Sequence, residues 1–479
     1  MYKLDPTSCI LPVEDRPVEL RHQHFVITPN FQDQVLACKG IYALSTTAST
    51  CGDSCFFSLD VHDLLIDSVV DARNSQKLKY SIKENENASC DMCSQYLQVE
   101  IPKLLCAENE FRIEITWKTD ARCSAIQWLL PLQTFSKSHP YVYTQLQAIH
   151  ARSLFPCLDS PSFKCSYSAV IDLTECPGMK AVMSAQRKAS PSDRSYLFAF
   201  AIGNIDGICI GPRSTVYGEP VQVQIAAKEF SDTETFLQLA EKVAGSPYMW
   251  TDYNILVLPP GFPFGGMENP CLTFVTPSLL AGDKSLVDVV IHEICHSWTG
   301  NSVTSCSWEH FWLNEGWTMF LERKILSQIY DEKYRHFSAL LGLEELAADV
   351  EEYRRKCDPS PWTRLVVDLS NGKDPDDAFS RVPYEKGHTL LFYLETIVGQ
   401  DAFLSYMQKY LKHFATRSIS TDEWLQHLIS SFPCGTFDTV DWEAWLHGHG
   451  MPPKIPNYDT SMRDSVLVLI GKLMLLLSL

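Results

Sequence analysis

The stretch VVIHEICHSWTGN (Val289–Asn301) places a carboxylate between two histidines that are four residues apart. On a helix, His292 and His296 lie on one face, one turn apart, so both imidazoles can reach one ion. Glu293 then lies beside the ion, where a general base can take a proton from water. The apolar run 289–291 predicts a buried helix, and two buried histidines without a partner are energetically unfavourable. The stretch therefore favours a metal site over a chance pair of histidines.

A catalytic zinc ion needs a third protein ligand and one open position. Glu315, in WLNEGW, follows His296 after an 18-residue gap and lies in a long helical pattern over residues 307–329. A hairpin of two helices would bring Glu315 over the first helix, which predicts one zinc ion per chain. Glu322 lies seven residues further on the same helical face. It either holds a ligating histidine or is solvated and paired with a neighbouring basic residue.

Upstream, PFGGMENP (Pro263–Pro270) contains two adjacent glycines followed by a glutamate. Glycines let a backbone approach a ligand closely, which suits an edge strand that pairs with a peptide. Glu268 in such a strand would bind a free α-ammonium group. The alternative interpretation of this segment is a simple β-bulge turn.

Around these motifs, short β-rich runs fill the chain from about residue 19 to 211, and helical patterns dominate from residue 284. Between them, VQVQIAA (221–227) and NILVLPP (254–260) are typical of strands. Possible capping boxes at Ser231 and Ser285 predict two helix starts. The order predicts a multidomain α+β protein: a β-sandwich-like domain over residues 1–215, an α+β catalytic domain over 216–450, and a Pro-rich linker with an apolar tail over 451–479.

Composition limits the partners. The net charge of −18 disfavours binding to nucleic acid and to anionic membranes, and weakly favours cationic substrates. The 17 cysteines have irregular spacings, so free thiols in a reduced cytoplasmic protein are favoured over a zinc knuckle at CGDSC or CDMC. The N-terminus has no signal-peptide core, and the apolar tail 466–479 is too short to span a bilayer, so no stable membrane insertion is expected.

Five segments together, GGMENPCLTFVTPSLLAGDKSL, HEICHSWTGN, HFWLNEGW, VPYEKG and DWEAWLHGHGMPP, resemble the M1-type zinc aminopeptidases, which are gluzincins. Within that family the chain is similar to the branch of leukotriene A4 hydrolase and aminopeptidase B. The resemblance covers the chain from about residue 20 to 459. It implies a zinc site and a set of catalytic and substrate-binding groups. His292, His296 and Glu315 would bind zinc, Glu293 would be the base, and Tyr384 would stabilise the oxyanion. Glu268 and Gln147 would bind the substrate amine, Gly265, Gly266 and Met267 would line the scissile peptide, and Asp376 would direct water onto a lipid epoxide or bind a basic first residue.

The resemblance further implies a thermolysin-like catalytic domain and substrates that are peptides with a free N-terminus, with leukotriene A4 as a possible second substrate. Phe379 stands where tyrosine is usual in this branch, and Phe264 where leukotriene A4 hydrolase has tyrosine. At Phe264 the chain is similar to aminopeptidase B, and the hydroxyl missing at Phe379 disfavours the lipid-product chemistry but not the peptidase core. The helical C-terminal domain of the family is expected to be absent here. The alternative function is therefore an inactive, truncated isoform that acts as a binding or regulatory protein.

Overall fold

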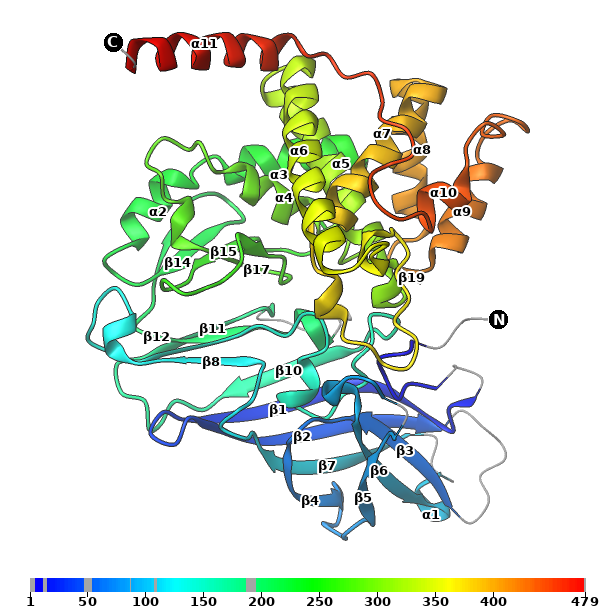
Figure 1. Ribbon diagram of the computed structural model, residues 1–479. Coiled ribbons are helices and arrows are strands. Elements are labelled where there is room, and N and C mark those ends of the chain that lie inside the picture. The colour runs from blue at the N-terminus through cyan, green and yellow to red at the C-terminus, as the bar shows by residue number, and fades with distance from the viewer. Residues whose placement is uncertain are drawn as a thin grey trace.

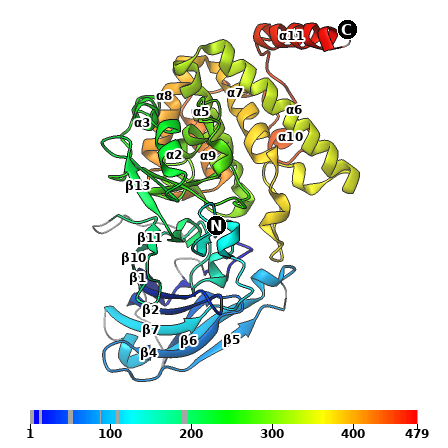
Figure 2. The same cartoon turned by 90° about the vertical axis from the view of Figure 1, so that its left-hand side faces the viewer.

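The structure is a computed structural model that describes residues 5–11, 15–46, 54–86, 88–106, 110–186 and 195–477. The β-sheets of the first half lie at one end of the molecule and the helices of the second half at the other (Figure 1). The turned view shows the same separation (Figure 2). A β-rich N-terminal domain followed by a helical catalytic domain was the order predicted from the sequence.

The N-terminal part contains a five-stranded and a three-stranded sheet around one apolar core. Buried residues alternate with partly exposed ones along most of these strands, as expected for a sheet with one face on the core. The core includes Phe25, Tyr42 and Trp117, whose rings pack edge to face. The first sheet has the order β10 (Ser166–Ile171), β1 (Val18–Asn30), β2 (Val35–Thr46), β7 (Glu110–Lys118), β4 (Leu65–Asp71), and the second has the order β3 (Ser54–Asp60), β6 (Gln95–Pro102), β5 (Tyr80–Glu84).

A third sheet connects the two halves of the chain. Its buried strands contribute Tyr141 and Tyr143 to an apolar cluster that also contains Met267, Phe274 and Trp308 from the second half. Packing between the two halves of the chain therefore holds this sheet against the catalytic part. The sheet has the order β11 (Lys180–Met183), β12 (Phe200–Gly203), β9 (Tyr141–Thr144), β8 (Ile126–Leu129).

The second half begins with a mixed sheet whose edge strand is β16 (Gly266–Met267), so GGMEN forms an edge strand and not an isolated turn. The predicted strand VQVQIAA is wrong, because this segment is the helix α2 (Val223–Glu229). Its buried residues recur every three positions, which is a helical spacing. This spacing outweighs the alternation of apolar and polar residues in VQVQ. The full order is β13 (Asp206–Cys209), β14 (Thr215–Gly218), β15 (Asn254–Val257), β17 (Leu272–Val275), β16.

Helix α5 (Trp312–Ile329) runs through the helical part and is buried along most of its length. It contacts α4 (Asp288–Cys295), which carries the HEICH motif, on one side and α7 (Gly387–Val398) on another.

Both predicted capping boxes are wrong: the residues before α3 and α4 are Asp232 and Val287, and neither side chain caps its helix. The other helices are α3 (Thr233–Ala244), α6 (Glu332–Lys356), α8 (Gln400–His413), α9 (Thr421–Ser430) and α10 (Trp442–Leu446). Three further elements are short: α1 (Lys103–Cys106) and the paired strands β18 (Thr304–Ser305) and β19 (Ser418–Ile419).

Residues 451–459 form an extended segment that leads to α11 (Ser461–Leu477), which projects from the body at the top of Figure 1. Its apolar side chains from Val466 to Met474 are largely exposed. Within the described ranges, the structure contains no helix long and apolar enough to cross a membrane. The domain bounds, the absence of a further helical domain and the cytoplasmic location stay predictions.

Candidate active site

The two histidines of HEICH meet a carboxylate from the next helix. His292 lies in α4 and His296 directly follows its last residue, one turn further along. Their Nε2 atoms are 3.1 Å apart. Glu315, in the first turn of α5, places Oε2 3.5 Å from Nε2 of His292 and 3.4 Å from Nε2 of His296. The three donor atoms therefore converge on one point.

The other ring nitrogen of each histidine has its own acceptor. Nδ1 of His292 lies 2.9 Å from Oε2 of Glu322, and Nδ1 of His296 lies 3.0 Å from the carbonyl oxygen of Thr299. Each Nδ1 therefore donates its proton, which leaves a lone pair on each Nε2 pointing at Glu315. Of the two interpretations of Glu322, the structure supports the histidine partner. Glu322 is buried, and the basic residues after it pair elsewhere: Arg323 with Glu385 and Lys324 with Glu395.

This donor set fits a zinc ion. Two imidazole lone pairs and a carboxylate repel one another when they converge, unless a cation lies between them. The Oε2 atom of Glu315 is buried without a hydrogen-bond partner. Tetrahedral zinc with bonds of about 2.1 Å would place its ligand atoms about 3.4 Å apart, close to the three spacings observed.

Glu293 lies next to this cluster with its carboxylate against the edge strand β16. Its Oε2 atom is buried and has no hydrogen-bond partner. A side chain on Gly266 would overlap the Glu293 carboxylate, so only glycine lets the strand approach this closely. Burial raises the pKa of Glu293 to about 8, although the nearby histidines lower it. A carboxylate with a pKa in this range can both accept and release a proton near neutral pH.

Glu268 is a second buried carboxylate beside the cluster. One oxygen from Glu268, one from Glu293 and a ring nitrogen of His296 all lie within 4.8 Å of one another. Gln147, from the N-terminal part, donates Nε2 to Oε1 of Glu268 at 3.5 Å. Asn301 donates Nδ2 to the backbone carbonyl of Glu268 at 2.8 Å, a contact that the sequence interpretation did not include. Burial raises the pKa of Glu268.

Tyr384 reaches the cluster from a π-helical turn, Val382–Lys386, just before α7. Its ring lies nearly parallel to that of His292, with centroids 6.1 Å apart. Two features hold this turn against α5. A side chain on Gly316 would lie 2.9 Å from Cα of Gly387, so two glycines permit the close approach. The guanidinium of Arg323 donates two hydrogen bonds, of 2.7 and 2.8 Å, to the carboxylate of Glu385, and both residues are buried.

Asp376 lies on a 3₁₀ turn, Pro375–Ala378, and its carboxylate contacts a group from the N-terminal part. Oδ2 of Asp376 is 2.9 Å from Nε2 of His150. Phe379, which follows this turn, packs its ring against Phe311 at 5.2 Å between centroids. Gly265 and Met267 flank Gly266 on the edge-strand segment, where Met267 is buried and Gly265 exposed. The structure thus gathers the predicted metal, base, amine and tyrosine residues, and it connects Asp376 to a residue that the sequence interpretation missed.

Two family models match most of the chain. Residues 29–194 match the peptidase M1 N-terminal domain, and residues 228–442 match the peptidase family M1 domain. The chain is 41% identical to leucine aminopeptidase 2 of Ajellomyces capsulatus, over 88% of this chain and 68% of that protein. It is 39% identical to leukotriene A-4 hydrolase of Xenopus laevis, over 97% of this chain and 76% of that protein.

The structure of yeast LTA4 hydrolase in complex with bestatin superposes with a TM-score of 0.89 at 38% identity, covering 98% of this chain and 73% of that one. The native enzyme from Saccharomyces cerevisiae gives the same TM-score and coverage. This chain therefore spans about two thirds to three quarters of these relatives. The two matched domains and the identities to these relatives show that the chain belongs to peptidase family M1.

Proposed function

We propose that this chain is a zinc-dependent aminopeptidase that removes the first residue of peptides with a free N-terminus. The observation that carries the proposal is the buried Glu268 carboxylate beside Glu293 and His296. A buried anion attracts the α-ammonium of a peptide, since an unpaired charge in this position is unfavourable. The first peptide bond then lies beside the metal donors, and a peptide with a blocked N-terminus lacks the charge that pairs with Glu268.

The residues of the chain divide the chemistry among them. Glu293 takes a proton from water and passes it to the leaving amine. Its carboxylate is buried against the edge strand β16, and the raised pKa that results suits it to both transfers. Tyr384 donates its hydroxyl to the developing oxyanion. Gly265, Gly266 and Met267 offer the backbone of an edge strand to the substrate peptide, and Gln147 orients Glu268. His292, His296 and Glu315 would hold one zinc ion, which would supply Lewis acidity toward the scissile carbonyl and toward water.

The test uses the whole chain and fluorogenic amides of leucine, alanine and arginine, each with and without an N-acetyl group. We expect zinc bound at one ion per chain, hydrolysis of the free-amine substrates only, and loss of activity with a chelator. Glu268→Gln is expected to raise KM for free-amine substrates, whereas Glu293→Gln is expected to lower kcat with zinc retained. A folded, zinc-loaded protein that hydrolyses none of these amides would refute the proposal.

Hydrolysis of the epoxide leukotriene A4 is a second candidate function. Relatives in this family are leukotriene A4 hydrolases, and the Asp376 carboxylate is accessible, with 43% of its side chain exposed. The test is conversion of leukotriene A4 by wild type and by Asp376→Asn, with peptide hydrolysis measured in parallel. Peptide cleavage without epoxide conversion would remove this candidate and leave the aminopeptidase intact.

A further inference from the structure

One short turn from the N-terminal part, residues 145–150, contacts two carboxylates of the catalytic part. Gln147 donates to Glu268, at 3.5 Å, near the start of the turn. His150 lies three residues later and meets Asp376 at 2.9 Å. The two carboxylates are 108 residues apart in the sequence, and this turn gives each of them a side-chain partner. The turn therefore joins the proposed site for the substrate amine to the Asp376 loop.

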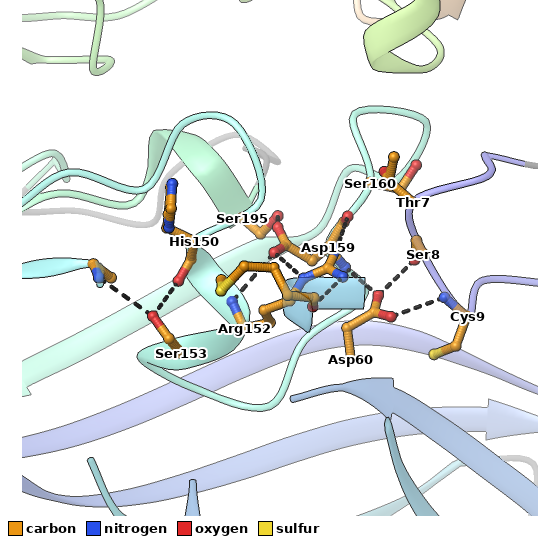
Figure 3. Close-up of polar contacts among 12 residues, drawn as sticks. Thr7, Ser8, Cys9, Asp60, His150, Arg152, Ser153, Asp159, Ser160 and Ser195 are labelled. Carbon is orange, nitrogen blue, oxygen red and sulfur yellow. Dashed lines mark hydrogen bonds and ion pairs between the residues drawn. The ribbon is translucent and has the colours of Figure 1, made fainter. Parts of the chain in front are cut away.

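Two further hydrogen bonds hold His150 in place on its own side of this contact. Nδ1 of His150 lies 2.8 Å from Oγ of Ser124, and the hydroxyl of Ser153 donates to the carbonyl oxygen of His150 at 2.7 Å. Just after it, Arg152 is fully buried and donates Nε and its backbone N–H to Oδ2 of Asp159. Figure 3 shows the His150 ring pointing away from this buried Arg152–Asp159 pair. The ring is thus anchored at its backbone and at one nitrogen, and the other nitrogen is left for Asp376.

The Asp376 side of the contact faces solvent. Asp374 caps the turn by accepting the backbone N–H of Asp376 at 3.0 Å. The Asp376 side chain is 43% exposed, against 20% for that of His150, so the carboxylate keeps room for a second, incoming partner. A cationic side chain on the first residue of a substrate would pair with this carboxylate, and a neutral one would not.

The charge of His150 decides how much of the Asp376 charge remains for a substrate. Burial lowers the pKa of His150, but the hydrogen bond and charge of Asp376, with the charges of Asp159 and Asp374, outweigh burial and raise it. Arg152 also lies nearby, and its guanidinium pairs with Asp159. Below the pKa of His150 the imidazolium neutralises Asp376. Above it, the neutral ring still donates a hydrogen bond and the carboxylate charge is free to attract a cation.

We infer that His150 is a positioning residue that holds Asp376 beside the proposed site for the substrate amine, and that its protonation sets how strongly the enzyme prefers a cationic first residue over a neutral one. The inference rests on the proposed aminopeptidase function, which it deepens by naming the residue that controls selectivity. It requires no change in the metal donors or in Glu293.

The experiment compares two substrates of equal length, the coumarin amides of arginine and of its uncharged isostere citrulline. The ratio of their kcat/KM values, measured from pH 6 to 9, cancels ionisations that affect both substrates equally. For wild type, we expect this ratio to rise about fivefold with pH, since a partly exposed ion pair contributes up to about 1 kcal/mol. His150→Gln keeps a donor for Asp376 but has no charge, so its ratio is expected to stay at the high-pH value throughout.

Three further variants complete the test. Asp376→Asn is expected to give a low ratio at every pH, and Ser124→Ala, which frees the ring, to raise KM for the arginine substrate more than it changes kcat. His24→Gln is the matched control. This histidine lies on β1 with its Nδ1 2.9 Å from Ser168, and the variant is expected to keep the wild-type profile. Thermal unfolding of each variant confirms that it is folded.

A wild-type ratio that does not change with pH, or a His150→Gln profile that matches wild type, would overturn the role of His150. In either case both amides would still be hydrolysed, so the aminopeptidase proposal would stand. Absence of hydrolysis of both amides by zinc-loaded wild type would instead overturn the aminopeptidase proposal, and this inference with it.

Discussion

Gly266 offers a sharp test of how the edge strand and the proposed base share space. In a Gly266→Ala variant, the added Cβ would lie 2.5 Å from Cδ and 2.7 Å from Cγ of Glu293. Carbon atoms pack at about 3.5 Å or more, so the Glu293 carboxylate has to move by about 1 Å. It is the flexible end of a side chain, and the movement therefore changes the stability of the fold little. The effect falls on the position of the base.

A displacement of about 1 Å at a reacting group lowers the rate about 100-fold. We therefore expect kcat for leucine coumarin amide to fall about 100-fold in Gly266→Ala, with the zinc content and the unfolding temperature close to wild type. The matched control is Gly218→Ala, in β14 of the same sheet. Its added Cβ would lie 3.7 Å from the nearest atoms of Val257, an ordinary contact, so kcat is expected to stay unchanged.

Two results would refute this reasoning. If Gly266→Ala kept more than about a third of the wild-type kcat, Glu293 would not need its observed position, since the 100-fold estimate would be missed by far. If the variant lost zinc, the defect would lie in the metal ligands and not in the base.

The other predictions concern metal affinity, a buried ion pair and one buried carboxyl group. Glu322→Gln removes the charge that holds Nδ1 of His292, and we expect zinc affinity to fall about 10- to 100-fold in competition with a chromogenic chelator; an unchanged affinity would contradict this. Arg323→Ala leaves Glu385 buried without its two hydrogen bonds, and we expect urea unfolding to show a loss of about 3–5 kcal/mol; a loss below about 1 kcal/mol would show that water replaces the arginine. Burial raises the pKa of Asp5 to about 6 from 3.8, so the folded state binds this proton more tightly than the unfolded state. The stability from Asp5 is then complete below about pH 4 and falls by roughly 3 kcal/mol as the pH rises through 6. The difference in unfolding free energy between wild type and Asp5→Asn, measured from pH 4 to 7, isolates this effect, and a difference independent of pH would contradict it.

Much of the fold followed from local patterns. Period-two alternation predicted the strands of the N-terminal part, and the long helical pattern from residue 307 predicted α5. Local patterns failed where two periods overlapped or where a cap depended on the approach of the chain. In the segment that includes residues 221–227, the buried residues recur at a helical spacing. Before α4, the N-cap residue is Val287 and not Ser285, so the Ser285 hydroxyl has no helix start to cap.

The sequence by itself determined the geometry of HEICH, because a spacing of four residues on a helix places two imidazoles together whatever surrounds them. The family motifs also named Glu315, Glu268 and Tyr384 as their companions. Only the tertiary structure decided the partner of Glu322, and only it joined His150 to Asp376 across 226 residues of chain. Such contacts depend on how separate helices and sheets pack, and no local spacing encodes that distance.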